Sequence, residues 1–321
     1  MIRLVSARWL FLLASFIILS SCVTPGSTRD VQEEQEVVYP PYSGVKKRVA
    51  VLEFDNKVSN RWWDRSWNIE ERLTEMVITE LMKTNRFIVV ERGALDEVLR
   101  EQDLGESGRV RQETAAKVGE VLGAQVLIKG AVTEFIEKES GGAGGIIISG
   151  IGIGGKTSTG HVAMDMRLID ATSGQILQSH RAESKITNSA LGGIAFFKGI
   201  AFGGSTFKKT PLGKATRNAV ADAVRFVMEN MEDQPWEGQV IKVDGQSVYI
   251  NAGFNMNIAN DMVFTVFSRG EDLIDPATGL KLGSAIKRIG TVRVVQVSDK
   301  FAIAQTVEGS GFKRGDILKL Q

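Results

Sequence analysis

The chain has 321 residues, of which 39 are Lys or Arg and 38 are Asp or Glu, so its formal net charge is +1. A balanced charge without a large basic block argues against nucleic acid as the main partner. With a single cysteine and two histidines in the sequence, an internal disulfide is impossible, and a zinc site or a Cys/His catalytic pair is disfavoured.

The N-terminal residues predict an export signal and a lipid anchor. Arg3 and Arg8 accompany an apolar run over residues 9–19, which is shorter than the about 20 residues of a membrane-spanning helix and typical of a secretory signal. The run ends in "LSSC", which resembles the bacterial lipobox, so we expect removal of residues 1–21 and a covalent lipid on Cys22. The residue after Cys22 is Val23 and not Asp, which would redirect sorting, so the resemblance favours the outer membrane. An ordinary signal peptide with a chance cysteine is the alternative.

Residues 22–47 contain Pro, Gly and the charged run "DVQEEQE", which predicts a tether. Strands are then expected over 48–54, 86–92 and 124–132, where β-branched and apolar residues gather. A helix is expected after Asn68, capped by Asn68 together with Glu71, and two more over 93–102 and 111–122. This order predicts an α/β domain with helices packed on a sheet.

Two glycine-rich apolar stretches follow, over 141–160 and 191–204. Between them, residues 162–169 alternate in the period of a strand, and "DATSG" at 170–174 indicates a turn. Pro211 begins a long helix whose apolar stripe contains Val220, Val224, Val227 and Met231. After the linker "DQPW", residues 236–321 form many short alternating runs, which predict a small β-barrel or sandwich.

Residues 150–157, "GIGIGGKT", fit the pattern of a phosphate-binding loop. That loop works only when a helix begins directly after it. Here Ser158, Thr159 and Gly160 lead into the alternating run, which predicts a strand. We therefore expect no nucleotide site, no other cofactor and no enzymatic activity, and Lys156 at a water-facing position.

A solvated glycine linker is the simpler interpretation of the two stretches, but it would leave many large apolar side chains exposed. Each stretch is long enough for a membrane-spanning strand, which takes about 9–11 residues. Because lipid excludes open sheet edges, two hairpins per chain require neighbouring protomers to close a barrel. The membrane-hairpin candidates are Ile147, Ile151, Ile153, Ile194, Phe196, Ile200 and Phe202.

Residues 22–231 resemble the curli secretion channel (CsgG-type) lipoproteins. The resemblance rests on Cys22, on the second glycine-rich stretch, and on "VAVLEF", "NRFIVVERGALDEVL", "GAQVLIKGAV" and "MDMRLIDATSGQIL". It implies a periplasmic α/β domain over 48–232 and a homo-oligomeric ring of about nine protomers. It also implies membrane hairpins near 132–168 and 182–208 that join into one transmembrane β-barrel.

The resemblance further implies that the loop before the first helix lines the narrowest part of the channel. The constriction candidates in that loop are Asn60, Trp62, Trp63 and Trp67. The family's tyrosine–asparagine–phenylalanine trio is absent at the family's spacing, and packing of individual tryptophans in the core or at a protomer interface is the alternative.

The C-terminal domain, 236–321, is absent from short curli channels and resembles the end of flagellar assembly T-type lipoproteins. Three functions remain open at this point. The first is an outer-membrane pore that passes a secreted protein with the help of periplasmic accessory proteins and without nucleotide. The second is a lipid-anchored periplasmic module that regulates envelope or flagellar assembly. The third, a nucleotide-hydrolysing enzyme, requires a phosphate loop that the flanking sequence disfavours.

Overall fold

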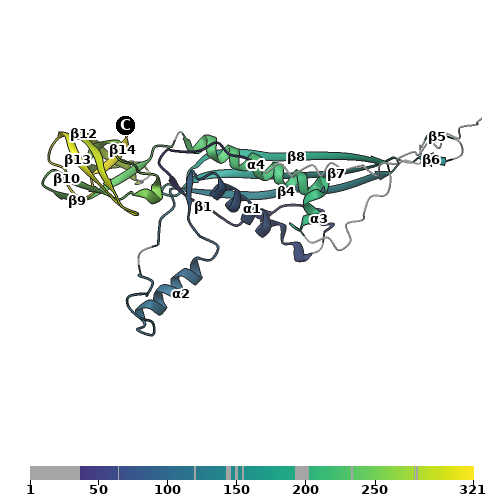
Figure 1. The fold of residues 1–321 in the computed structure, drawn as a ribbon, viewed down its shortest axis with the longest axis horizontal. Coiled ribbons are helices and arrows are strands. Elements are labelled where there is room, and N and C mark those ends of the chain that lie inside the picture. Colours follow the sequence, from purple (N-terminus) through teal and green to yellow (C-terminus); the bar gives the residue numbers. More distant parts are fainter. Residues whose placement is uncertain are drawn as a thin grey trace, which may run out of the picture. The chain divides into compact units, whose positions relative to one another are not determined.

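The computed structural model describes residues 37–63, 65–118, 121–141, 146–148, 151–153, 155–191, 202–232, 234–277, 279 and 281–321. The chain divides into the units Met1–Val38 and Tyr39–Gln321, and the described helices and strands belong to the second. This unit contains a mixed sheet with helices and a closed barrel (Figure 1).

The mixed sheet is built from short parallel strands and long antiparallel ones. Its strands are β1 (Lys47–Val51), β2 (Asp55–Asn56), β3 (Phe87–Val89), β4 (Val126–Gly141), β7 (Gly155–Asp170) and β8 (Ile176–Leu191). Their order is β3-β1-β4-β7-β8, and β2 pairs with β4. β1 pairs in parallel with β3 and β4, whereas β7 pairs antiparallel with β4 and β8.

Helices α1 (Ile69–Lys83) and α4 (Pro211–Glu232) pack on one face of this sheet. α1 buries Leu73, Val77 and Leu81 there, and α4 buries the predicted stripe, so both helices are fixed by amphipathic faces. Gly160 allows a close approach on β7, since a Cβ at this position would lie 2.2 Å from the backbone nitrogen of Leu212. The short α3 (Ser205–Lys209) precedes α4.

The start of α1 differs from the predicted capping box. Asn68 has φ 39° and makes no side-chain cap; instead its Nδ2 donates to Glu71 Oε2 at 3.2 Å. A short 3-10 helix, η1 (Arg65–Trp67), leads into α1 from the preceding loop. The left-handed conformation lets the chain turn sharply from this loop into the helix, and it takes Asn68 out of the extended geometry that a capping residue needs.

The helix predicted over 93–102 is α2 (Leu95–Glu106), but the one predicted over 111–122 does not form. The described residues of that segment are turns and coil, and Val118, Val121 and Leu122 are 49%, 36% and 51% exposed. A helix of about 12 residues is marginal unless packing stabilises its apolar face. The apolar face of residues 111–122 has no core against which to pack in one chain.

The first hairpin is continuous with the sheet. β4 and β7 pair from Val126↔Asp170 out to Gly141↔Lys156, and the short strands β5 (Ile146–Ile148) and β6 (Ile151–Ile153) pair antiparallel beyond them. The pair Ile148↔Ile151 leaves residues 149–150 between β5 and β6. β7 also confirms that a strand, and no helix, follows "GIGIGGKT".

The turn between β7 and β8 depends on one carboxylate. Asp170 Oδ1 accepts hydrogen bonds from the backbone nitrogens of Thr172 and Ser173 at 3.0 and 2.7 Å, and from Ser173 Oγ at 2.9 Å. These bonds, with that from the Ser173 backbone the strongest, hold the pKa of Asp170 below its ordinary value. Gly174 completes the turn with φ 74°.

We expect Asp170→Ala to lower the free energy of unfolding by about 0.5–1.5 kcal/mol, because the exposed donors of the turn lose a charged acceptor. A carboxylate with a lowered folded pKa stabilises the fold above its unfolded pKa of about 3.9, and that contribution disappears as the pH falls through the folded value. Urea unfolding at pH 7 and pH 3 measures both effects. The difference between parent and variant should shrink at pH 3; an unchanged difference contradicts the role of the charge. Asp170→Asn, which keeps an acceptor oxygen, is the control.

The C-terminal domain is a closed barrel and not a sandwich. Its strands are β9 (Glu237–Asp244), β10 (Ser247–Ile250), β11 (Val263–Ile274), β12 (Lys281–Val297), β13 (Ala302–Gly309) and β14 (Ile317–Leu320), ordered β10-β13-β12-β11-β14-β9. A 3-10 helix, η2 (Phe254–Met256), follows β10. Phe264, Val248 and Leu318 are fully buried in the barrel, and Trp236 packs on Phe264 with ring centroids 5.3 Å apart.

Candidate functional site

The loop between β2 and α1, residues 57–68, is called the Trp loop below. Trp63 is 6% exposed and Trp67 packs against the buried core cluster, so both anchor the loop from inside. The prediction of Trp63 as a constriction residue is therefore wrong for this structure, because its ring is enclosed by the core. Asn60 is exposed and Trp62 is 41% exposed, which leaves these two side chains as the loop's outward-facing candidates.

An aromatic cluster fixes the Trp loop on the sheet. The fully buried Phe135 of β4 is its centre, with ring centroids 5.2 Å from Trp63 and 6.1 Å from Trp62. The indole Nε1 of Trp62 donates to the Phe135 carbonyl oxygen at 2.8 Å, and its ring lies within 9° of parallel to the Phe135 ring. One face of Trp62 is thus held by β4 while the rest of the ring meets solvent.

Phe202 belongs to the same cluster, which corrects its assignment to a membrane hairpin. Its side chain is 7% exposed, and its ring centroid lies 5.5 Å from Trp67 and 4.7 Å from Phe207. A residue packed in this core does not face lipid. Because α3 also begins at Ser205, the predicted limit of 208 for the second hairpin is wrong.

The other hairpin candidates divide into two groups. Ile147 lies in β5, and Ile151 and Ile153 lie in β6, all within the paired hairpin. Ile194, Phe196 and Ile200 lie outside the described residues, as does Cys22, the predicted lipidation site.

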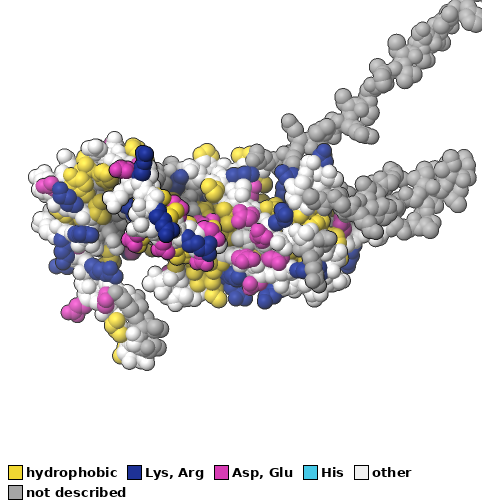
Figure 2. All heavy atoms as spheres, turned by 90° about the horizontal axis from the view of Figure 1, so that it is seen from below, with side chains coloured by type: hydrophobic (Ala, Val, Ile, Leu, Met, Phe, Trp, Pro, Cys, Tyr) yellow, Lys and Arg dark blue, Asp and Glu magenta, His cyan; other side chains and the backbone are white. Residues whose placement is uncertain are grey.

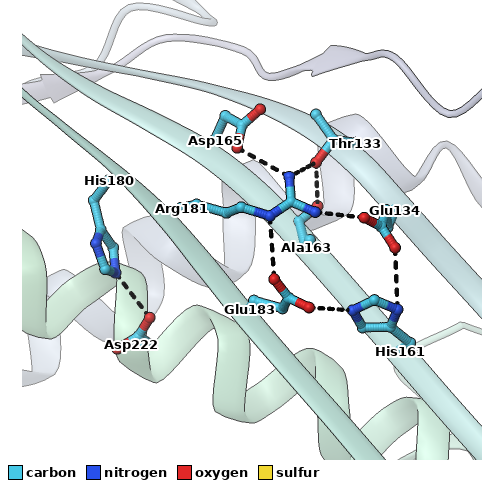
Figure 3. Close-up of polar contacts among 9 residues, drawn as sticks. All are labelled: Thr133, Glu134, His161, Ala163, Asp165, His180, Arg181, Glu183 and Asp222. Carbon is cyan, nitrogen blue, oxygen red and sulfur yellow. Dashed lines mark hydrogen bonds and ion pairs between the residues drawn. The ribbon is translucent and has the colours of Figure 1, made fainter.

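A polar network crosses the three long strands on the face opposite α1 and α4 (Figure 3). The guanidinium of Arg181 on β8 bonds to Glu183 Oε2 at 3.1 Å, Asp165 Oδ1 at 3.3 Å and Thr133 Oγ1 at 3.0 Å, and to Glu134. The hydrogen bond with Glu183, followed by the contacts with Asp165, raises the pKa of Arg181 above its ordinary value. This one side chain therefore connects β4, β7 and β8.

His161 on β7 joins the same network from the other side (Figure 3). Its Nδ1 lies 3.1 Å from Glu134 Oε2 and its Nε2 lies 2.7 Å from Glu183 Oε1. A neutral imidazole has a single N–H, so only the protonated ring donates to both carboxylates. The network ties β4, β7 and β8 together on the face away from the helices.

A second histidine contact joins β8 to α4. His180 Nε2 lies 2.9 Å from Asp222 Oδ2, and the His180 ring stacks on Phe226 at 4.9 Å. Arg225 also lies 3.6 Å from the Asp222 carboxylate. This contact fixes the outer strand on the helix layer, so the long strands have support on both faces at their base.

Sequence reasoning missed Phe135 and the Arg181 network. Phe135 follows a bulge in β4, between Val132 and Glu134, which brings it to the core face out of simple alternation. The network had a weak signal, since "HRAE" places Arg181 and Glu183 two residues apart and "HVAMD" places His161 and Asp165 four apart, so that each pair lies on one face of its strand. Without the register Asp165↔Arg181, these charges could not be paired.

Three further properties of the described residues concern surface charge, metal binding and membrane-spanning helices. Acidic and basic side chains are interspersed over the face seen in Figure 2, as the near-zero net charge suggests. Among the described residues, no group of His, Cys, Asp or Glu has the arrangement of a metal site. No helix in the described part of the chain is long and apolar enough to cross a membrane.

Comparison with known proteins identifies the family. The family model of the curli production assembly/transport component CsgG matches residues 31–257. The chain belongs to the CsgG family. The match covers the mixed sheet and its helices and reaches into the first strands of the barrel, so the family relation extends past the limit of 231 that we predicted.

Two relatives illustrate the distance within the family. A Neisseria meningitidis serogroup B protein named as a lipoprotein, NMB1126/NMB1164, is 25% identical over 233 residues, which cover 70% of this chain and 95% of that protein. CsgG of Escherichia coli K12 is 23% identical over 186 residues, covering 53% of this chain and 67% of CsgG. The solved structure of the hypothetical protein CT253 from Chlamydia trachomatis aligns with a TM-score of 0.37 at 14% identity, over 57% of this chain and 96% of CT253. That score is too low to support a conclusion about function.

Proposed function

We propose that the protein is a subunit of an oligomeric outer-membrane pore that exports or assembles extracellular protein without nucleotide. The observation that carries this proposal is the three-stranded ribbon β4-β7-β8, which runs beyond the helices into a paired hairpin of glycine and isoleucine. CsgG family membership supports a curli-type secretion role, and the named neisserial lipoprotein supports an envelope lipoprotein.

The open edges of the ribbon favour assembly. Among the described residues, β4 pairs only with β7 beyond Val132, and β8 pairs only with β7 along its length. Unpaired strand edges are costly in lipid and adhesive in water. Pairing of the two edges with neighbouring protomers would satisfy the unpaired backbone groups of β4 and of β8. A ring of about nine copies, implied by the family resemblance, would then close the barrel.

The lipid on Cys22 would hold each protomer at the membrane before the hairpins insert. A single acyl chain gives only marginal binding, whereas several chains anchor stably. With the hairpins in the outer membrane, the remaining domains would face the periplasm. Secreted protein would then enter from the periplasm, and accessory proteins would meet the soluble domains.

The Trp loop would form the constriction, with Trp62 and Asn60 as the residues that meet the passing chain. We expect Trp62→Ala to raise the single-channel conductance severalfold, because a large ring is removed from every protomer at the narrowest level. The variant also loses the hydrogen bond to the Phe135 carbonyl, which costs about 0.5–1.5 kcal/mol, and its ring stack on Phe135. The domain should stay folded, since Trp63 and Trp67 still anchor the loop. Planar bilayer recordings provide the measurement. Phe254→Ala, which removes a 62% exposed aromatic ring from the barrel domain, is the control and should leave the conductance unchanged.

Protease digestion of intact outer membranes tests the proposal against a periplasmic binding module. If the hairpins cross the membrane, residues 141–160 and 191–204 should be protected, and electron micrographs of the purified lipidated protein should show rings. Ready cleavage within both stretches, together with a monomeric Cys22→Ala protein and no membrane activity of the lipidated form, would favour the binding module.

A further inference from the structure

An apolar row crosses the sheet on the face opposite α1 and α4. Ala50 on β1 pairs with Leu127 on β4, Leu127 with Ile169 on β7, and Ile169 with Ile176 on β8. Directly paired residues point to the same face, and the neighbours Val126, Ile128 and Leu168 lie in the core on the other face. Leu127 and Ile169 are half-buried and Ile176 is 51% exposed, so the row is open to solvent towards β8.

Positive charge borders this row. Lys129 on β4 pairs directly with Arg167 on β7, two residues along each strand from Leu127 and Ile169 and therefore on the same face. Lys129 Nζ lies 3.0 Å from Asp55 Oδ1, while the Arg167 side chain is exposed. The surface thus combines an apolar strip with a basic border.

Helix α2 has the complementary character. Its sequence, "LDEVLREQDLGE", contains five acidic residues and one basic residue. Val98 and Leu99 are 38% and 43% exposed, and Asp96 and Asp103 lie three residues before and four after Leu99, on the same side of the helix. The acidic side chains of α2 therefore complement the positive charge beside the row, and its exposed apolar side chains complement the apolar row.

The topology of the sheet points to the same pairing. α1 connects β1 to β3, and α2 connects β3 to β4 on the far side of β1, so the two crossings run in opposite directions. Right-handed crossovers place such helices on opposite faces of a parallel sheet. α2 should therefore cover the face with the apolar row, but Val98 and Leu99 of α2 and Ile176 of the row all stay exposed.

The arm that carries α2 is held in this position by its own contacts. At its base, Arg92 Nη2 donates to the Leu122 carbonyl at 3.1 Å, and Arg48 Nε donates to the Gly123 carbonyl at 2.9 Å. Within the arm, α2 lies against the returning segment, because a Cβ on Gly105 would be 2.5 Å from the Ala116 carbonyl oxygen. The arm is closed on itself and tied at its root. Ala50 at the β1 end of the row is buried, whereas Ile176 at the β8 end stays exposed.

From this complementarity we infer that α2 of one protomer docks on the apolar row of a second copy of the chain. Each copy gives one arm and receives another, which is a head-to-tail contact of the kind that builds closed rings. The inference rests on the proposed function in that it supplies a periplasmic contact for the same ring. Leu99 meets the row around Ile176, and the acidic side chains of α2 meet Arg167.

Disulfide capture tests this contact in the lipidated, full-length protein. One copy carries Leu99→Cys and a co-expressed copy, distinguishable by a tag, carries Ile176→Cys. Because a disulfide needs Cα atoms within about 7 Å, mild oxidation should yield a mixed covalent dimer. The control replaces Ile176→Cys by Val307→Cys, a residue of the barrel that is 55% exposed, and should yield severalfold less dimer.

Two further variants test whether opposite charges on the two copies hold this contact. Arg167→Glu on the receiving copy should lower the mixed dimer severalfold, and Asp103→Arg on the giving copy should restore it. A single chain with both cysteines should produce a ladder of oligomers. If that chain forms only an internal disulfide, or if the mixed dimer equals the Val307→Cys control, the inference is overturned. Rings in micrographs with no mixed dimer would overturn this contact alone, whereas a parent protein without rings would overturn the proposed function.

Discussion

Ile151→Arg is expected to abolish insertion of the protein into the outer membrane while the soluble domains stay folded. A lipid-facing arginine in a transmembrane barrel costs about 2–4 kcal/mol at the bilayer midplane and about 0–1 kcal/mol near its edges. Because the ring repeats this cost in every protomer, even a substitution close to the hairpin tip should cost several kcal/mol in total. Ile151 lies in β6 opposite Ile148, next to the residues that separate β5 from β6. Extraction of membranes with carbonate, followed by immunoblotting, measures insertion.

The matched control is Ile241→Arg in the C-terminal barrel, where the isoleucine is 40% exposed and lies far in sequence from the hairpins. This variant should insert like the parent. If Ile151→Arg also inserts normally and still conducts ions, residues 151–153 do not face lipid, and the assignment of the first glycine-rich stretch to a membrane hairpin fails.

Phe135→Ala is expected to lower the free energy of unfolding of the α/β domain by about 3–5 kcal/mol, the usual cost of removing a fully buried phenylalanine. The ring is 0% exposed and contacts Trp62, Trp63, Trp67 and Phe202. The same cavity should loosen the Trp loop. Urea unfolding followed by tryptophan fluorescence reports on this region, because three tryptophans lie in the loop.

We expect the barrel, which has its own buried core, to unfold in a separate transition that serves as an internal reference. Far-ultraviolet circular dichroism should show one transition shifted to lower urea and the other unchanged. Phe254→Ala, at a 62% exposed position in the barrel domain, should change neither by more than about 0.5 kcal/mol. A shift of both transitions would contradict a local role for Phe135.

Local sequence patterns predicted the secondary structure correctly where the patterned residues are buried. The stripe on α4, the turn at 170–174 and the alternating strand after "GIGIGGKT" all follow from periodicity, because each element presents one side to the core. The regular spacing of short strands after residue 236 predicted a small β domain, although the closure into a barrel needed the pairing of β9 with both β10 and β14.

The failures arise where tertiary contacts override the local signal. Residues 111–122 carry a helical pattern, yet Val118, Val121 and Leu122 stay exposed and do not reach a buried core in one chain. Phe202 looked like a continuation of an apolar membrane stretch, and its place in the core depends on contacts with Trp67 and Phe207. Similarly, nothing in "NRWWD" separates the buried Trp63 from the exposed Trp62.

The central claim is that this protein forms a pore by itself. Single-channel recording of the purified, lipidated protein in planar bilayers, in the absence of nucleotide, tests it most directly. We predict stepwise, long-lived conductance that Trp62→Ala enlarges and that ATP does not alter. Stable binding of the lipidated protein to the bilayer with no conductance steps would contradict the account.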